Sequence, residues 1–116
     1  VEGGAMSVTY TREIIDVTEG PRNYVKDVLV DPSCMGETCR LFAQLTVAPH
    51  SELPTHQHVG EAEAYYILSG TGTYNDNGVE RQVSAGAVTF CDDGESHGLV
   101  NDSDEPVVLI ALIIGK

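Results

Sequence analysis

Turn-forming residues interrupt this chain at short intervals and leave room only for short extended segments. Runs rich in β-branched and aromatic residues recur, and each is bounded by a cluster of Gly, Pro, Asn or Asp. No segment keeps the 3.6-residue apolar period of a helix over three turns. The pattern predicts an all-β fold, an antiparallel sandwich or barrel without long helices. We expect strands over residues 8–17, 24–30, 40–48, 63–75, 79–85, 87–91, 96–101 and 107–114.

The segments between these runs are expected to be turns and loops. The tightest is Asn77-Gly78, because a two-residue type I′ turn requires positive φ at both central positions. Gly70 and Gly72 lie inside an expected strand, where glycine indicates a bulge or a close backbone approach. The remaining loops are expected over residues 31–37, 49–54, 92–95 and 101–106.

The charge of the chain argues against several classes of partner. It has 18 acidic and 6 basic residues, for a formal charge of -12. Such a field repels phosphate backbones and anionic lipid, so we expect neither a nucleic acid nor a membrane as a partner. No apolar run is long enough to span a bilayer, and no secretory signal pattern is present. The unpaired spacing of Cys34, Cys39 and Cys91 fits a reducing compartment, so we expect a cytoplasmic protein.

We interpret the chain as one domain. Its 116 residues suit a single hydrophobic core, and no repeat or linker interrupts them. Residues 1–5 (VEGGA) precede Met6 and are expected to be an expression remnant, which leaves residues 6–116 as the domain.

Three of the four histidines lie in a pattern that suits a metal ion. Side chains alternate along a strand, so His56 and His58 face the same side. Glu63 follows a short bend and can bring an oxygen to the same point, and His97 enters a later strand after a Gly-containing turn. This nitrogen and oxygen set suits one divalent transition metal, Mn, Fe, Ni or Zn, and not a thiolate-bound structural zinc. From these residues alone, the alternative is a polar strand edge with solvated histidines.

The spacing of these residues resembles the two motifs of the cupin superfamily, especially its small single-domain metal-binding members. The resemblance covers roughly the central half of the chain, and it departs from the family at Asp92, where cupins usually have proline. It implies a small antiparallel jelly-roll β-barrel with an ion inside, and water or ligand at the remaining coordination positions. The matched positions are His56, His58, Glu63 and Gly70 in the first motif, and Gly86, Asp92, Gly94, His97 and Asn101 in the second. The implied metal ligands are His56, His58, Glu63 and His97.

The resemblance leaves the reaction open, because cupins include dioxygenases, decarboxylases, isomerases and lyases. We expect a metal-dependent enzyme that acts on a small oxygen-rich metabolite, such as a hydroxy acid, a dicarboxylate or a sugar acid. The metal would serve as a Lewis acid or as an oxygen-activating centre. The alternative is a non-catalytic module that binds a metabolite or a metal. A structural or storage role would leave the metal set without a purpose.

Alternation from Glu63 also predicts the wall of the ligand pocket. Tyr65 and Ile67 share its face, and Tyr65 is the candidate catalytic residue; the alternative is an aromatic that only fills the barrel. Val88 and Phe90 are expected in the pocket or core wall. One of the scarce arginines inside the barrel would pair with a substrate carboxylate; the candidates are Arg12, Arg40 and Arg81.

Three other polar residues are expected to lie outside the metal site. His50 is interpreted as an exposed loop residue, with a role at the pocket rim as the alternative. Glu61 is expected to face solvent or the mouth of the pocket, because the motif spacing selects Glu63 as the ligand. Asn101 is expected to shape the turn after the strand that carries His97.

The last run, residues 107–114, is apolar on both faces and predicts a partner. A strand of this kind must be covered on both sides, by a second sheet or by another subunit. We therefore expect a homodimer in which the N-terminal run, residues 8–17, lies against the partner. Small cupins similar to this chain often pair through their sheets. The alternative is a monomer in which residues 8–17 fold back onto their own barrel.

Overall fold

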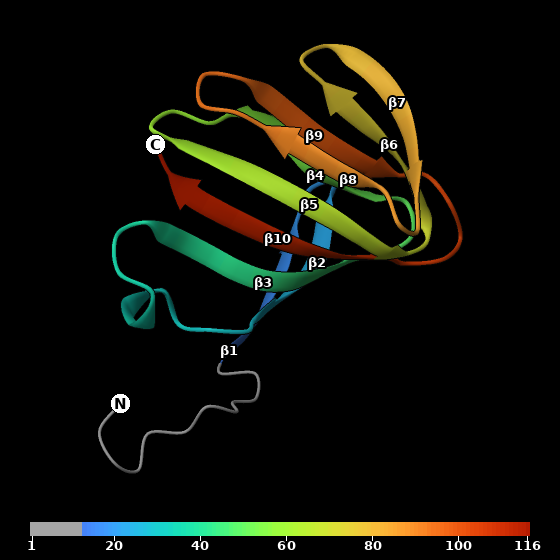
Figure 1. Ribbon diagram of the computed structural model, residues 1–116. Coiled ribbons are helices and arrows are strands. Elements are labelled where there is room, and N and C mark those ends of the chain that lie inside the picture. The colour runs from blue at the N-terminus through green and yellow to red at the C-terminus, as the bar shows by residue number, and fades with distance from the viewer. Residues whose placement is uncertain (1–12) are drawn as a thin grey trace.

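The structure is a computed structural model that describes residues 13–116, and nearly all of its regular structure is antiparallel β-sheet (Figure 1). The described residues form ten strands in two sheets. The six-stranded sheet contains, in spatial order, β1 (Glu13–Glu19), β2 (Arg22–Val28), β3 (Cys39–Val47), β10 (Val107–Gly115), β5 (Glu61–Ser69) and β8 (Val88–Cys91). The four-stranded sheet contains β4 (Ser51–Gln57), β9 (Ser96–Asn101), β6 (Thr71–Asp76) and β7 (Val79–Ser84).

The hydrophobic core lies between the two sheets. Its buried side chains alternate along the strands, as in Leu45 and Val47 of β3, or Leu109 and Ala111 of β10, and they meet Leu99 from β9. The sheets face one another and are not joined into a closed cylinder of hydrogen bonds. The all-β, jelly-roll prediction is confirmed. The helical structure in the described chain is the short 3-10 turn η1 (Pro32–Cys34), and no described helix is long and apolar enough to cross a bilayer.

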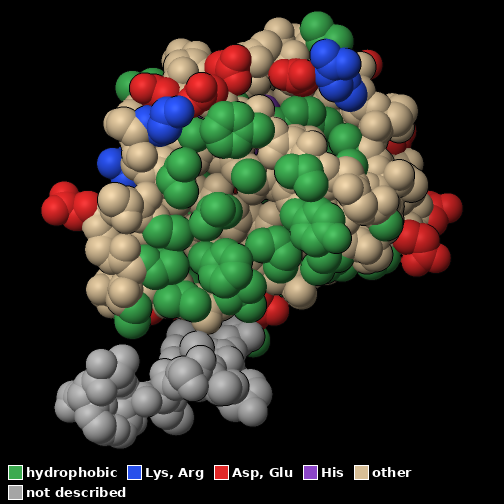
Figure 2. Space-filling model, in the orientation of Figure 1, with side chains coloured by type: hydrophobic (Ala, Val, Ile, Leu, Met, Phe, Trp, Pro, Cys, Tyr) green, Lys and Arg blue, Asp and Glu red, His purple; other side chains and the backbone are tan. Residues whose placement is uncertain are grey.

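The two faces of the six-stranded sheet are both apolar, but the described residues cover only one of them. On β10, Val107 and Leu109 are completely buried against the core, whereas Leu112 is exposed on the other side. Figure 2 shows apolar side chains gathered over the face where β5, β8 and β10 lie, with charged side chains around its edge. We call this surface the outer apolar face, and its exposed members are Tyr66, Leu68, Val88, Phe90 and Leu112.

The prediction that Val88 and Phe90 line the core or pocket is wrong. Their side chains are 69% and 53% exposed and belong to the outer apolar face. The reason is the phase of β8, in which Cys91 takes the buried position opposite Glu63 and its neighbours alternate outwards. Both sides of β8 carry apolar residues, so composition alone did not fix which side faces the core.

The expected strand over residues 63–75 is two strands in different sheets. The two strands are separated at Gly70, which has φ of 87°. A Cβ at this position would collide with the carbonyl oxygen of Pro106. A Cβ at Gly72 would lie 3.0 Å from the side chain of Leu99 and 3.1 Å from the carbonyl oxygen of Val100. Both glycines therefore permit the close backbone approach that the sequence predicted. The turn at Asn77-Gly78 is also confirmed, with φ of 52° and 92°.

The expected loop over residues 49–54 contains the first half of β4. Pro54 lies within this strand, where it donates no hydrogen bond to the ladder. It is accommodated because β4 is an edge strand of its sheet and its pairing with β9 shifts between Leu53 and His56. Proline was therefore a misleading signal of a loop at this edge.

The N-terminal run is described only from Glu13 onward. Its described part, in β1, pairs with β2 of the same chain, from Glu13 opposite Val28 to Glu19 opposite Arg22. The predictions for residues 1–5, for Met6 and for residues 8–12, Arg12 included, lie outside the described residues.

Candidate metal centre

The four predicted ligands come together from both sheets. His56 lies on β4 directly opposite His97 of β9, and His58 follows immediately after the end of β4. Glu63 reaches the same point from β5 of the other sheet. One ligand atom from each residue lies within 4.8 Å of all the others, so the cluster could hold a metal ion.

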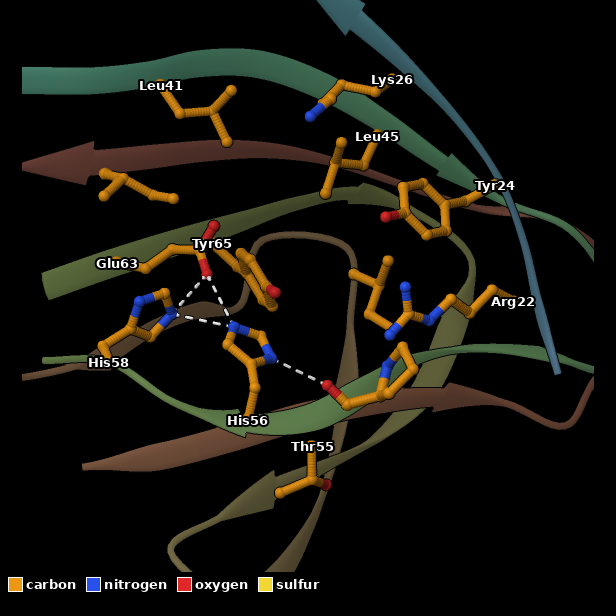
Figure 3. Close-up of a pocket in the computed structure, with 13 residues that line it drawn as sticks. Arg22, Tyr24, Lys26, Leu41, Leu45, Thr55, His56, His58, Glu63 and Tyr65 are labelled. Carbon is orange, nitrogen blue, oxygen red and sulfur yellow. Dashed lines mark hydrogen bonds and ion pairs between the residues drawn. The ribbon is translucent and has the colours of Figure 1, made fainter. Parts of the chain in front are cut away.

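The ring nitrogens named Nε2 form the centre of this cluster, and Figure 3 shows His56 and His58 meeting Glu63 there. The Nε2 of His58 lies 3.0 Å from that of His56 and 3.1 Å from that of His97. Oε1 of Glu63 lies 2.9 Å from the Nε2 of both His58 and His97, and 3.8 Å from that of His56. Three imidazoles and one carboxylate oxygen therefore point at one small volume.

The other nitrogen of each ring, Nδ1, is held from outside the cluster. The Nδ1 of His56 lies 2.8 Å from the carbonyl oxygen of Pro54, and that of His58 lies 2.7 Å from Oε2 of Glu61. The Nδ1 of His97 lies 2.8 Å from the hydroxyl of Tyr74. Such outer partners orient the ring and select its tautomer.

These partners make the donor set suitable for a divalent cation. A carbonyl oxygen and a carboxylate only accept, so Nδ1 of His56 and of His58 each carries the hydrogen. In the neutral rings, the lone pairs on Nε2 then point at each other and at the Glu63 carboxylate. Lone pairs in this arrangement repel unless a cation lies among them. Neutral imidazole and carboxylate are ligands of first-row transition metals, so the residues fit that class of ion.

The carboxylate of Glu63 carries negative charge in this buried position. Burial opposes its ionisation, but His56 and His97, whose Nε2 atoms can each carry a proton in place of a metal ion, outweigh that effect and lower its pKa to about 2. The nearby Glu63 carboxylate, whose Oε1 lies 3.8 Å from Nε2, in turn raises the pKa of His56, against the opposing effect of burial. The cluster thus places an ionised carboxylate among buried residues.

Tyr65, the candidate catalytic residue, lies in the wall beside the cluster. Its ring stacks on that of His97, with centroids 4.8 Å apart and planes at 24°. Burial, reinforced by the negative charge of Glu63, raises the pKa of its hydroxyl well above the ordinary range. The hydroxyl therefore stays protonated and can donate a hydrogen bond to a bound molecule.

Sequence reasoning missed two residues that orient the histidines. Glu61 was expected to face solvent or the pocket mouth, but it binds His58 and accepts a hydrogen bond from Arg40 at 3.1 Å. Its position two residues before Glu63, on the same strand face, was a signal that could have found it. Tyr74 offered no local signal, because 23 residues separate it from His97 and only the pairing of β6 with β9 brings them together.

A cavity of about 300 Å³ opens beside the cluster, bounded by His56, His58 and Glu63 on one side (Figure 3). Tyr65 forms part of its wall, and apolar residues such as Leu45 form much of the rest. Three residues of β2 close the opposite side: Arg22, Tyr24 and Lys26.

Of the expected pocket arginines, the two that the structure describes are used elsewhere. Arg40 pairs with Glu61, and Arg81 pairs with Asp76 at 2.8 Å on the surface. Neither residue lines the cavity. His50 is an exposed residue, as expected, and lies 2.7 Å from Asp104. The cations that line the cavity were not among the candidates that the sequence suggested.

The architecture and the cluster together define a class: a jelly-roll protein with a three-histidine, one-glutamate site that could bind a metal ion. Residues 43–113 match the model of the Cupin_2 family, which is described as a cupin domain. The chain therefore belongs to the cupin family.

Two comparisons with Thermotoga maritima proteins extend this assignment. A protein named "Oxalate-binding protein" is 41% identical over 86 residues, which cover 74% of this chain and 71% of the relative. A crystal structure described as a predicted oxalate decarboxylase is 35% identical, with a TM-score of 0.82 over 92% of this chain and 94% of that one. KdgF from a Halomonas species is only 15% identical, with a TM-score of 0.76 over 95% of this chain and 96% of that one, so it supports the fold alone.

Proposed function

We propose that this protein holds one divalent transition metal at His56, His58, Glu63 and His97, and binds a small oxygen-rich acid to it. The observation that carries the proposal is the convergence of three Nε2 atoms on Oε1 of Glu63 while outer partners hold two of the Nδ1 hydrogens. Four protein ligands leave about two positions in an octahedral shell. A molecule that chelates through two oxygens fits these positions.

The names of the relatives support a dicarboxylate of the oxalate type. One relative is named for binding oxalate, and a second is described as a predicted oxalate decarboxylase. Oxalate offers two oxygens to one ion in a five-membered chelate ring, which matches the two remaining positions. Hydroxy acids and sugar acids chelate in the same way and belong to the same proposal.

Metal content separates this proposal from a cluster of histidines without an ion. The chain is stripped with a chelator, reloaded separately with Mn, Fe, Ni or Zn, and analysed for metal. We expect one ion per chain, and loss of that ion in His56→Ala, whose half-exposed side chain makes this the least disruptive ligand to remove. His50→Asn removes a histidine outside the cluster and should keep the ion. Retention of the ion by His56→Ala would overturn the proposal.

Catalysis on the bound acid is the second candidate function, and Tyr65 is the observation that favours it. Among the described residues that line the cavity, Glu63 is the only carboxylate, and it is already committed as a ligand. The Tyr65 hydroxyl, which stays protonated beside the cluster, is the donor that we assign to this step. A metal in this site would supply Lewis-acid or redox chemistry. The chain's own contribution would be to bind the acid, exclude water and deliver a proton.

Turnover of labelled oxalate distinguishes an enzyme from a binding protein. Decarboxylation converts hydrogen oxalate to formate and carbon dioxide, and ¹³C NMR follows both products. For an enzyme, we expect formate to accumulate with the loaded wild type, and Tyr65→Phe to bind oxalate but form product at least about tenfold more slowly. Binding without any product would favour the non-catalytic alternative. Tyr66→Phe, on the outer apolar face, is the matched control.

We also propose that two chains pair through the outer apolar face. The support is the exposure of Val88, Phe90 and Leu112 on a sheet face that no described residue covers. Light scattering at micromolar concentration should give about twice the 12.4 kDa of one chain. Phe90→Glu should shift the protein to monomer, whereas Val79→Glu, equally exposed on the four-stranded sheet, should not. A wild-type mass of one chain would overturn the dimer.

A further inference from the structure

Strand β2 presents three hydrogen-bond donors to the cavity. Arg22, Tyr24 and Lys26 occupy alternate positions and therefore share one face of the strand. Figure 3 shows their polar ends directed toward the space in front of His56 and Glu63. The strand is fixed in this position, because Tyr24 pairs with Val47 of β3 and the backbone of Pro21 accepts a hydrogen bond from Glu52 of β4 at 3.0 Å.

The charge of this wall is opposite to that of the rest of the protein. Only 6 of the 116 residues are Lys or Arg, against 18 Asp and Glu. Yet two of the six line this one cavity, and of the acidic residues in the described chain only Glu63 does so. If charged residues were placed at random, the cavity would contain more carboxylates than cations, in the ratio of 18 to 6 found in the whole chain. The cavity is therefore enriched in positive charge relative to the rest of this acidic chain.

Within residues 13–116, these two cations also lack close acidic partners. Outside the cavity, the described Arg40, Arg81 and Lys116 each lie within 3.1 Å of a carboxylate. By contrast, Lys26 forms no ion pair or hydrogen bond with any described residue, and Arg22 has only a loose contact of 3.8 Å with Glu19. Their positive charge is left available for a molecule in the cavity.

The charge of the metal site shows what that molecule must be. A divalent ion contributes +2 and Glu63 contributes -1, so the three neutral histidines complete a site of charge +1. One negative charge on the ligand balances this site, and a second negative charge exceeds it. In a chain of formal charge -12, that second charge needs further cations nearby. Arg22 and Lys26 are the cations that the cavity offers.

We propose that Arg22 and Lys26 are specificity-determining residues, which select a small dianionic acid over a chelator of the same shape with one charge fewer. Tyr24 adds a hydroxyl that can donate to the same ligand. The inference rests on the proposed function, because it concerns the ligand of that metal. The inference goes beyond the proposed function because it assigns recognition of the ligand's second negative charge to β2. The metal recognises only the chelating oxygens.

Oxalate and oxamate are the probes that isolate the second charge. Oxamate replaces one carboxylate with a carboxamide, so it keeps the two-oxygen chelate and loses one negative charge. Calorimetry on the Mn-loaded full chain measures the affinity for each probe. The test variant is Arg22→Gln/Lys26→Met, and the control is Arg81→Gln/Lys116→Gln, which removes the same charge from surface ion pairs. Metal content is measured first in every sample.

The expected result is a change in selectivity and not only in affinity. The test variant should lose roughly tenfold or more of its oxalate affinity and no more than about threefold of its oxamate affinity. The control should change neither by more than about threefold. The charge-conserving Arg22→Lys/Lys26→Arg should keep most of the preference for oxalate. If the double variant does not fold, Arg22→Gln and Lys26→Met are tested singly, and each should show part of the same change.

The outcomes separate this inference from the proposed function. Equal losses for both probes, or no loss for either, would overturn the role of β2 while leaving the metal site intact. An equal effect in the surface control would do the same, because it would assign the effect to net charge. A loaded wild type that binds neither probe would overturn this inference and the oxalate-type ligand of the proposed function, and the measured metal content would still test the metal site by itself.

Discussion

Two buried polar groups on β9 lie four residues apart and differ in how their hydrogen bonds are completed. The side chain of Asn101 is completely buried, and its Nδ2 donates to the carbonyl oxygens of Val47, Ala48 and Glu105. Its Oδ1 accepts from both the backbone and the hydroxyl of Ser103. His97 is just as buried, but its Nε2 faces only other ring nitrogens and a carboxylate.

The difference shows how burial of a polar group should be interpreted. Asn101 is satisfied by the protein alone, so its burial serves the fold, in agreement with its expected role in the turn after the strand. The cluster around His97 is complete only when a cation is present, so its burial serves a ligand. Both residues belong to one motif, and only their partners separate the structural role from the functional one.

Loss of Asn101 should have the largest effect on the fold. Asn101→Ala removes the donors for three carbonyl groups and should lower the free energy of unfolding by about 3 kcal/mol. Urea denaturation of the metal-free chain measures this. Ser103→Ala, which removes one neighbour of Asn101, should cost much less. The folded Asn101→Ala chain should still hold one metal ion, and loss of that ion would contradict the distinction between the two sites.

Removal of the metal should have the next largest effect, and only through the cluster. An ion that binds the native state alone stabilises it by about 2.7 kcal/mol when its free concentration is one hundred times its dissociation constant. Chelation should therefore lower the melting temperature of the wild type. It should not change that of His56→Ala, which is the internal control. A wild type that melts at the same temperature after complete metal removal would contradict the prediction.

The hydroxyl of Tyr74 should affect the metal more than the fold. Tyr74→Phe keeps the ring but leaves Nδ1 of His97 without its partner. Loss of such an outer partner typically weakens metal binding 10- to 100-fold. Competition with a chromophoric chelator measures the change, and Tyr66→Phe on the outer apolar face provides the matched control. Unchanged affinity in Tyr74→Phe would show that packing alone orients the histidine.

The smallest effect is expected at His50, the histidine outside the cluster. Hydrogen bonds to Asp104 and Asp102 raise its pKa above the ordinary value of 6.5. Because the folded pKa is the higher one, the stabilisation is fully present below pH 6.5 and is lost as the pH rises through the folded pKa. His50→Asn should make stability less dependent on pH in this window, and asparagine suits the positive φ of 57°. NMR titration of the His50 ring would contradict the prediction if it gave a pKa below 6.5.

The sequence was sufficient to predict the fold class because turn-forming residues and the alternation of side chains along a strand are local features. Short strands, the Asn77-Gly78 turn and the covered face of β10 all follow from residues close together in the chain. Pro54 was misleading because its tolerance depends on β4 being an edge strand, which is a property of the whole sheet. The same limit explains the wrong prediction for Val88 and Phe90. The side of β8 that faces away from the core can also be apolar, because it belongs to the outer apolar face.

The candidate site divides in the same way. The spacing of the motifs identified the four residues that come together, including the choice of Glu63 over Glu61. Arg22 and Lys26 could not be identified, because they reach the cavity only when β2 joins β3 and approaches β4. Asp92, where cupins usually have proline, is held instead by Lys116 at 3.0 Å and by the side chain of Glu95. The contact with Lys116 connects the turn to a distant part of the chain.

The division of the ligands between two sheets has a consequence for the kinetics of folding. His56 and His97 belong to the four-stranded sheet and Glu63 to the six-stranded sheet, so the full set of donors exists only after the sheets have packed together. We expect an ion that needs all of them to bind late, after the main barrier has been crossed. Interactions that form after the transition state slow unfolding and leave the folding rate nearly unchanged. The ion should therefore lengthen the lifetime of the native state, and stopped-flow unfolding with and without metal would measure by how much.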